Sequence, residues 1–222
     1  MKLIAHRGWS AGTEENTLAA FARAARADGI SGVEFDVRGV AESVTLVVSH
    51  DPPKHGERAL TLDAALSFLS GTALELYVEI KEAGIVASVI AALVASKAAE
   101  RSVVFGFPDV ARSFPWRAAR PVRLGIIAVY PWTLDSVVRK YAPDVLSFGW
   151  DERAWTRIAF RAWWSVFSLE RCARRHRVQL VVGIAQRQDD LDWLARQHVD
   201  AAVADMEPIS PARGVFTSRP LA

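Results

Sequence analysis

Short runs of apolar, often β-branched residues alternate with longer segments rich in alanine, leucine and arginine along the chain. Most of the short runs are continuously apolar, which is typical of parallel strands that are buried on both faces. The predicted strands are 3–5, 33–37, 44–49, 74–80, 102–105, 122–127, 145–148, 179–182 and 201–204. The predicted helices are 17–27, 61–69, 85–99, 133–141, 158–175 and 189–197. Since a strand, a crossover helix and a second parallel strand form the unit of a parallel sheet, this alternation predicts an α/β fold.

The length of 222 residues suits one (β/α)8 barrel of the TIM type, as a single domain over residues 1–222. Nine predicted strands compete for eight barrel positions, and the weakest pattern, 145–148, is expected to be peripheral. An open parallel sheet is the alternative. We find no linker and no low-complexity segment that would divide the chain.

Composition and charge exclude several classes of function. The formal net charge of +2 provides no broad basic field for nucleic-acid binding. Cys172 is the only cysteine, which excludes an internal disulfide and a cysteine-rich zinc site. No run of 18 apolar residues occurs, so no transmembrane segment is expected. The chain enters its first predicted strand at once, which leaves no room for a signal peptide, and a cytoplasmic location is expected.

Acidic residues stand at the ends of two predicted strands. Glu34 and Asp36 flank Phe35, so the alternation of side chains along a strand places both carboxylates on one face. Glu79 and Lys81 repeat the arrangement at the end of a later strand. A solvated strand end is the simpler explanation, but carboxylates are seldom buried without a partner. Three carboxylates with no cysteine nearby form an oxygen-donor site that suits one divalent cation, Mg²⁺ or Ca²⁺.

Two histidines also end predicted strands. His6 follows the first strand and His50 follows the third. The carboxyl ends of parallel barrel strands meet on one rim, where the active sites of such barrels lie. Imidazole donates or accepts a proton near neutral pH, so this pair beside three acids indicates acid–base catalysis rather than a structural role. His176 and His198 lie in polar or basic segments and are expected at the surface.

Five short blocks give the sequence a more specific resemblance. They are Ile4-Ala-His-Arg-Gly8, Glu15-Asn-Thr17, Gly32-Val-Glu-Phe-Asp-Val37, Ser49-His-Asp-Pro52 and Val78-Glu-Ile-Lys81. In this order they resemble the signature blocks of the glycerophosphodiester phosphodiesterases. The resemblance implies His6 and His50 as the catalytic pair. It further implies metal ligands at Glu34, Asp36 and Glu79, and substrate-binding cations at Arg7 and Lys81.

The resemblance implies a metal-dependent hydrolase that cleaves a glycerophosphodiester to an alcohol and sn-glycerol 3-phosphate. Its partner would be a small phosphodiester rather than a nucleic acid. Two other functions remain open: a lyase that uses the same residues to release a cyclic phosphate, and a metal- and phosphate-binding module without catalysis. The complete set of two histidines, three acids and two cations favours an enzyme, because binding alone needs no proton-transfer pair. We expect Asn16, in the second block, to be structural and to cap the following helix.

The remainder of the chain departs from the family pattern. Family members usually carry a long insertion after the His-Asp-Pro block, but here only residues 53–60 stand before the next helix. The strand ends near 104–107 and 182–186 also differ from the usual blocks, as does 204–208. The proton-transfer and metal residues are therefore expected to be complete, with altered walls around the substrate.

Tryptophan is frequent, with eight residues, and three of them fall in one helical segment. Trp155, Trp163 and Trp164 lie near Arg157 and Arg161. Such a helix could touch a membrane surface, but packing over the barrel or in a homo-oligomer contact is the favoured interpretation. Trp9 could line the substrate pocket or belong to the core.

Overall fold

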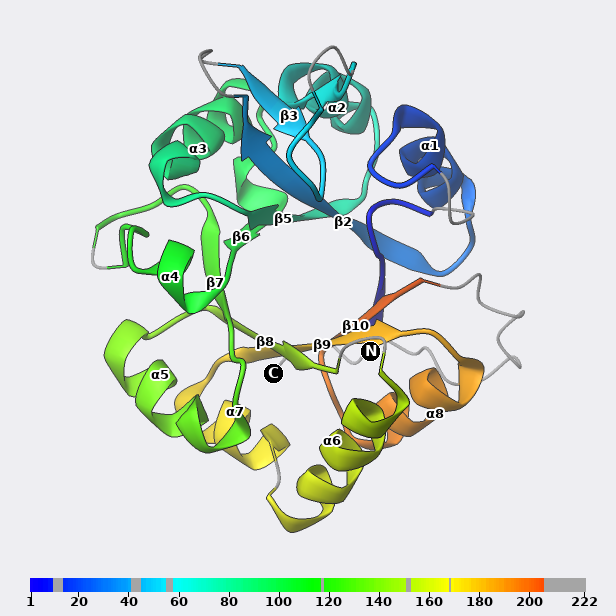
Figure 1. Ribbon diagram of the computed structural model, residues 1–222, viewed down its shortest axis with the longest axis vertical. Helices are drawn as coiled ribbons and strands as arrows, with labels where there is room; N and C mark the ends of the chain where they lie inside the picture. The colour runs from blue at the N-terminus through cyan, green and yellow to red at the C-terminus, as the bar shows by residue number, and fades with distance from the viewer. Residues whose placement is uncertain are drawn as a thin grey trace.

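Eight parallel strands close into a barrel in the computed structural model, which describes residues 1–9, 14–40, 45–54, 58–116, 118–150, 153–167 and 169–205. The barrel strands are β1 (Lys2–Ala5), β2 (Ile30–Gly39), β5 (Glu75–Ile80), β6 (Ser102–Phe105), β7 (Arg123–Ile127), β8 (Val145–Gly149), β9 (Gln179–Ala185) and β10 (Ala201–Ala204). β1 pairs in parallel with both β2 and β10, and this closes the ring seen in Figure 1. The predicted TIM-type barrel is confirmed, and the open sheet is excluded.

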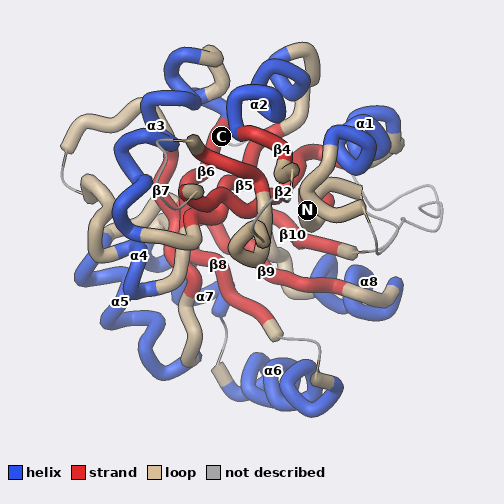
Figure 2. Tube along the Cα trace, turned by 45° about the horizontal axis from the view of Figure 1, so that its top comes forward, coloured by secondary structure: helices blue, strands red, loops and turns tan. Residues whose placement is uncertain are grey.

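Helices cover the outside of the ring (Figures 1 and 2). They are α1 (Leu18–Arg26), α2 (Leu62–Ser70), α3 (Val86–Ala95), α4 (Pro108–Ala111), α5 (Leu134–Tyr141), α6 (Ala154–Val166), α7 (Leu169–His176) and α8 (Gln188–Arg196), with 3-10 turns at 83–85, 99–101 and 131–133. Two apolar clusters follow from the alternation of side chains along each strand. In β1, Leu3 and Ala5 belong to the large cluster that the helices share, whereas Ile4 belongs to a smaller one with Tyr77 and Val103.

The segment expected to be peripheral is instead a barrel strand. β8 occupies 145–149 and pairs with β7 and β9, so that prediction is wrong. Its pattern is weak because Ser147 is polar, yet Ser147 lines a cavity at the barrel mouth, where a hydroxyl is tolerated. The supernumerary strand is β3 (Leu46–Val48), which runs antiparallel to β2 and to the two-residue β4 (Leu60–Thr61).

The predicted helix 158–175 is two helices, α6 and α7. Phe160 and Trp164 are buried on α6, and Leu169 and Ala173 are buried on α7. The spacing of these buried residues is four within each helix but five from Trp164 to Leu169, so the buried face of α7 does not continue that of α6. Phe167, between the two helices, has an extended backbone.

The tryptophan-bearing α6 packs over the barrel, as expected. Arg157 and Arg161 of α6 contact Asp190 of α8, with N–O distances of 3.3 and 2.5 Å. Asp190 is only 1% exposed, so this carboxylate and the two guanidinium groups join the helices. Trp155, at the start of α6, is exposed.

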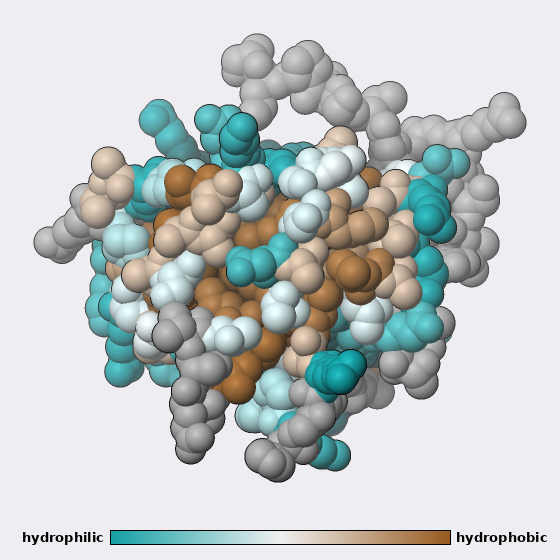
Figure 3. Space-filling model, turned by 90° about the horizontal axis from the view of Figure 1, so that it is seen from above, coloured by the Kyte–Doolittle hydropathy of each residue, from teal (hydrophilic) through white to brown (hydrophobic). Residues whose placement is uncertain are grey.

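The outer surface of the barrel is not uniformly polar. Figure 3 shows apolar surface on the side where α2 and α3 lie, and the alanine- and valine-rich α3 contributes to it. Trp9 is buried in the core and does not line the cavity described below. Among the described helices, none is long and apolar enough to cross a membrane.

Candidate active site

Three carboxylates meet where β2 and β5 end. Glu34 and Asp36 are two residues apart on β2, and Asp36 lies in register with Glu79 of the parallel strand β5. Each offers an oxygen atom within 4.8 Å of those of the other two. Glu34 and Asp36 are 2% and 1% exposed. On the other face of β2, Phe35 packs against Phe21 of α1 with ring centroids 5.6 Å apart, which fixes the two acids toward the barrel interior.

The electrostatics of this cluster fit a site for a cation. Burial, together with the charge of Asp36, raises the pKa of Glu34 to about 8. Burial also raises the pKa of Glu79, despite the nearby Lys81. Burial opposes ionisation of Asp36 too, but Lys81 and Asn16 outweigh it and hold its pKa below the ordinary value. Glu34 and Glu79 therefore lack enough compensating positive charge, and an all-oxygen donor set of this kind suits Mg²⁺ or Ca²⁺.

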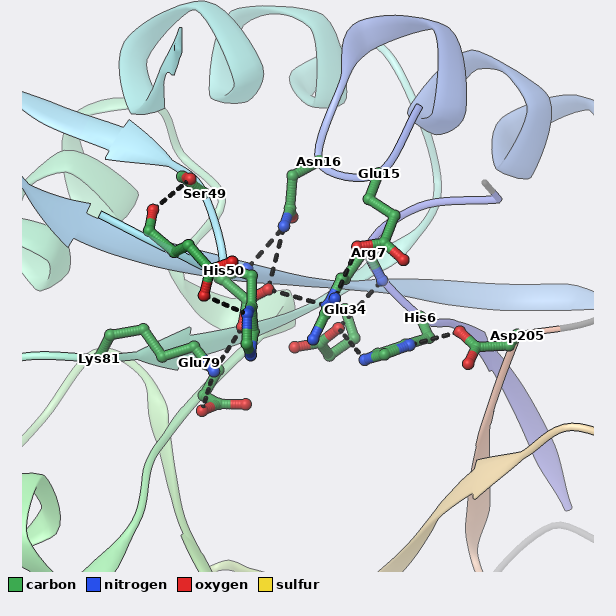
Figure 4. Close-up of polar contacts among 12 residues, drawn as sticks. His6, Arg7, Glu15, Asn16, Glu34, Ser49, His50, Glu79, Lys81 and Asp205 are labelled. Carbon is green, nitrogen blue, oxygen red and sulfur yellow. Dashed lines mark hydrogen bonds and ion pairs between the residues drawn. The ribbon is translucent and has the colours of Figure 1, made fainter. Parts of the chain in front are cut away.

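Two cations flank the carboxylates. The Lys81 Nζ lies 2.8 Å from Asp36 Oδ1 and 2.5 Å from Glu79 Oε1. The Arg7 Nε lies 3.2 Å from Asp36 Oδ2, and its Nη1 donates to Glu15 at 2.6 Å. Figure 4 shows Lys81 and Arg7 reaching the cluster from different strands. The structure thus brings together both cations predicted from the sequence.

A tight turn after β1 explains the His-Arg-Gly block. Arg7 and Gly8 both have positive φ, at 49° and 76°. The turn directs the Arg7 backbone N–H to Glu34 Oε2 at 3.0 Å. A Cβ at position 8 would lie 2.8 Å from the side chains of Ala20 and Phe21, so only glycine allows α1 to pack this closely.

Asn16 has a different role from the one expected. The helix cap is Thr17, whose hydroxyl accepts from the Ala20 N–H at 3.2 Å. Asn16 has φ 57°, which asparagine tolerates better than most residues. Its amide nitrogen donates to Asp36 Oδ2 at 3.0 Å, and its oxygen accepts from the Asp36 N–H at 3.3 Å. Asn16 is structural, as predicted, but it positions Asp36 rather than the helix.

His6 lies between two acids, one of which the sequence did not reveal. Its Nδ1 forms a close hydrogen bond with Asp205, immediately after β10, and its Nε2 lies 3.8 Å from Glu34 Oε2. Burial lowers the pKa of His6, but the bond to Asp205 and the charges of both acids outweigh it and raise the pKa above its ordinary value. With Nδ1 held, Nε2 is the ring nitrogen that faces the cluster.

His50 is the more exposed histidine of the pair, with 42% of its side chain accessible. Its Nδ1 lies 3.0 Å from Asp51 Oδ1, and its carbonyl accepts from Arg38 Nε at 2.8 Å. The charge of His50 partly opposes the rise in the pKa of Glu79 that burial causes. In Figure 4, His50 lies on the Glu79 side of the carboxylates and His6 on the Asp205 side. All seven predicted site residues therefore lie at one end of the barrel.

Replacing Asp205 with asparagine should lower the pKa of His6, because the bond and the charge that raise it are lost. NMR titration of the His6 ring would measure the shift, with the exposed Asp28→Asn as the matched control. We also expect kcat to fall roughly tenfold or more, since a carboxylate that orients a catalytic histidine acts in this way. An unchanged His6 pKa in Asp205→Asn would contradict this positioning role.

A cavity of about 390 Å³ opens beside the cluster. His6, Glu34 and Glu79 line one end. The rest of the described lining is mainly apolar and comes from the ends of β6 to β10. Lys81 lines a neighbouring depression with Phe107 and Val129. The site can therefore hold a small anionic molecule that has one charged part and one apolar part.

Comparisons with known proteins agree with this geometry. The sequence model of the glycerophosphoryl diester phosphodiesterase family matches residues 6–209. No curated protein matches the chain. A glycerophosphodiester phosphodiesterase structure from Agrobacterium tumefaciens is similar, with a TM-score of 0.75, 19% identity and coverage of 93% of this chain and 97% of that one. One from Parabacteroides distasonis has a TM-score of 0.74, 18% identity and coverage of 93% of each chain.

A phosphodiesterase from Oleispira antarctica, solved with the product sn-glycerol-3-phosphate, is also similar. Its TM-score is 0.68 at 18% identity, and the match covers 93% of this chain and 94% of that one. At these identities the structural likeness establishes the fold.

Proposed function

Since this chain belongs to the glycerophosphoryl diester phosphodiesterase family, we propose that it hydrolyses a glycerophosphodiester to an alcohol and sn-glycerol 3-phosphate. His6 and His50 would transfer the protons, Arg7 and Lys81 would bind the phosphate, and Glu34, Asp36 and Glu79 would hold a divalent cation. The observation that carries this proposal is the convergence of these seven residues at one end of the barrel, where such barrels carry out their chemistry.

The two cations suit a phosphodiester, which carries one negative charge. The guanidinium of Arg7 is a planar group with several donors, and its contacts to Glu15 and Asp36 fix its plane. Lys81 supplies a point charge that Asp36 and Glu79 hold in place. Burial lowers the pKa of Arg7 and Lys81, but the neighbouring acids outweigh it and raise both pKa values, so both side chains stay charged.

Glu34, Asp36 and Glu79 would supply the oxygen ligands for Mg²⁺ or Ca²⁺. Bound there, the cation would neutralise negative charge that develops on the phosphoryl oxygens. Together with Arg7 and Lys81, it would exceed the negative charge of the three acids by one. A bound phosphodiester would bring the summed charge of these groups to zero before either histidine is protonated.

The histidines would act on the two sides of the phosphorus atom. One imidazole removes a proton from an attacking water molecule, whose oxygen forms a new bond to phosphorus. The bond between phosphorus and the alcohol oxygen breaks, and the other imidazole protonates the leaving alkoxide. Asp205 holds His6 so that Nε2, which faces Glu34 and the cavity, is available for this transfer.

The direct test is a phosphorus NMR assay on a glycerophosphodiester, first with EDTA and then with excess Mg²⁺ or Ca²⁺. We expect turnover to be lost with the chelator, restored by the ion and to yield a phosphomonoester. Accumulation of a cyclic phosphate as the final product would identify a lyase instead. No turnover under any of these conditions would contradict an enzymatic function for this substrate class.

A further inference from the structure

The cavity beside the acid cluster is chemically divided. Its charged lining residues, within the part of the chain that is described, are those of the cluster: His6, Glu34 and Glu79. Apolar residues from five strand ends line the rest of the cavity. Phe105, Ile127 and Val203 belong to or pack against the cluster inside the barrel, whereas the rings of Phe148 and Trp150 belong to the outer cluster and pack against α6. Ser147 adds the one hydroxyl group among the described lining residues. A group that enters this half of the cavity contacts mainly apolar surface.

The apolar wall is firmly supported from behind. Phe148 and Trp150 pack against Phe160 of α6, with ring centroids 5.0 and 5.1 Å apart. Phe160 in turn packs against Trp164 and Trp193, at 5.6 and 6.1 Å. Since these rings are held by one another, the wall is formed before a ligand arrives. The aromatic residues of α6 thus shape the cavity without entering it.

The wall continues outward at the rim. Phe107, which follows β6, is 44% exposed, and Val129, which follows β7, is 47% exposed. Just beyond them Tyr130 and Trp132 stack, with centroids 5.0 Å apart, and Trp132 is 75% exposed. Apolar surface therefore runs from the acid cluster to solvent along one side of the barrel mouth.

We propose that the alcohol released by this enzyme is apolar, so that its substrate is a glycerophosphodiester of an alkyl chain rather than of a small polar alcohol. This inference rests on the proposed function and names its substrate class. The phosphate would lie at the cluster, and the alkyl chain would lie along Phe105, Ile127 and Phe107. A polar alcohol placed there would lose its water without gaining hydrogen-bond partners, which is unfavourable.

Aromatic walls can also bind a quaternary ammonium group through cation–π contacts. Choline and 3,3-dimethylbutanol have nearly the same shape and differ in charge, so their glycerophosphodiesters form a matched pair. An apolar site turns over the dimethylbutyl ester, whose alcohol part is uncharged, at least as efficiently as the choline ester. A clear preference for the choline ester would overturn the inference.

The main experiment compares ethyl, butyl and octyl esters of sn-glycerol 3-phosphate as monomers with wild-type protein. We expect kcat/KM to rise roughly threefold for each methylene that becomes buried, and to level off when the chain outgrows the cavity. Equal kcat/KM for all three esters would overturn the inference but leave the proposed function intact. Absence of turnover with every ester would overturn both.

Phe107→Ser tests the wall itself. Phe107 is the N-cap residue of α4 and makes no side-chain cap bond, so serine, a favoured cap, should not impair folding. We expect the ratio of kcat/KM for octyl over ethyl ester to fall at least fivefold. Phe167→Ser is the matched control, because Phe167 is 57% exposed at the end of α6 and does not line the cavity. An unchanged ratio in Phe107→Ser would contradict the position assigned to the alkyl chain.

Discussion

Replacing either His6 or His50 with alanine is expected to lower kcat by roughly 10²–10⁴, the contribution typical of a positioned general acid or base. Both rings lie beside the carboxylates, and His6 is fixed by its bond to Asp205. The two transfers belong to one reaction, so the double variant should lose less than the product of the two single losses. Steady-state kinetics at saturating substrate would measure all three.

The control for this pair is His198→Asn. His198 is exposed, lies at a different cavity and has a positive φ that asparagine accepts. Its kcat should equal that of the wild type, and thermal melts should show that all variants fold. Unchanged turnover in both His6→Ala and His50→Ala would remove the acid–base assignment.

Glu34→Gln should have two effects of opposite sign. It removes one of the three carboxylates that we propose to hold the cation, so kcat should fall by roughly 10³, in line with the several kcal/mol that a bound metal ion contributes to a transition state. It should also stabilise the metal-free protein at neutral pH. Burial and Asp36 raise the pKa of Glu34 to about 8, so the native state must hold a proton or a costly buried charge there.

The pH dependence of unfolding gives the sign of this effect. Between the ordinary carboxyl pKa and about 8, the native metal-free protein binds more protons at Glu34 than the unfolded chain does. Its free energy of unfolding therefore falls as pH rises through this range. Glu34→Gln should lose that slope and melt several degrees higher at pH 8, whereas the exposed Glu100→Gln should behave like the wild type. A lower melting temperature for metal-free Glu34→Gln would contradict the assigned repulsion.

Much of the site could be predicted from the sequence because its residues lie at the ends of the early predicted strands, within the first 81 residues. Two-residue spacing placed Glu34 and Asp36 on one strand face, and the parallel barrel brought Glu79 into register with Asp36. The continuous apolar strands predicted the parallel sheet, and His6 and His50, which directly follow two of them, predicted the rim.

Two supporting residues could not be found in this way. Asp205 bonds to His6 across 199 positions along the chain. Its only signal was a carboxylate directly after the last apolar strand. Asn16 resembled a helix cap by residue type, but its positive φ turns its side chain toward Asp36. The Asp205 contact arises where the last strand, β10, pairs with β1 and closes the barrel.

The fold errors have a similar origin. Strand β8 was expected to be peripheral because Ser147 interrupts its apolar run. In the structure Ser147 lines the cavity at the barrel mouth, where a polar side chain is tolerated. The antiparallel β3 resembles a parallel barrel strand in its composition, and its pairing with β2 determines its place. The local sequence pattern predicts which segments form strands, whereas the strands with which each one pairs depend on the arrangement of the whole barrel.

Titration of metal-free protein with Mn²⁺, followed by electron paramagnetic resonance and by phosphodiester turnover in the same samples, tests most directly whether Glu34, Asp36 and Glu79 hold a catalytic cation. We expect one tightly bound ion per chain, turnover that rises in proportion to it, and loss of both in a Glu34→Gln/Glu79→Gln double variant. Full turnover by the metal-free protein, or equal Mn²⁺ binding by that variant, would contradict the assignment of these three carboxylates.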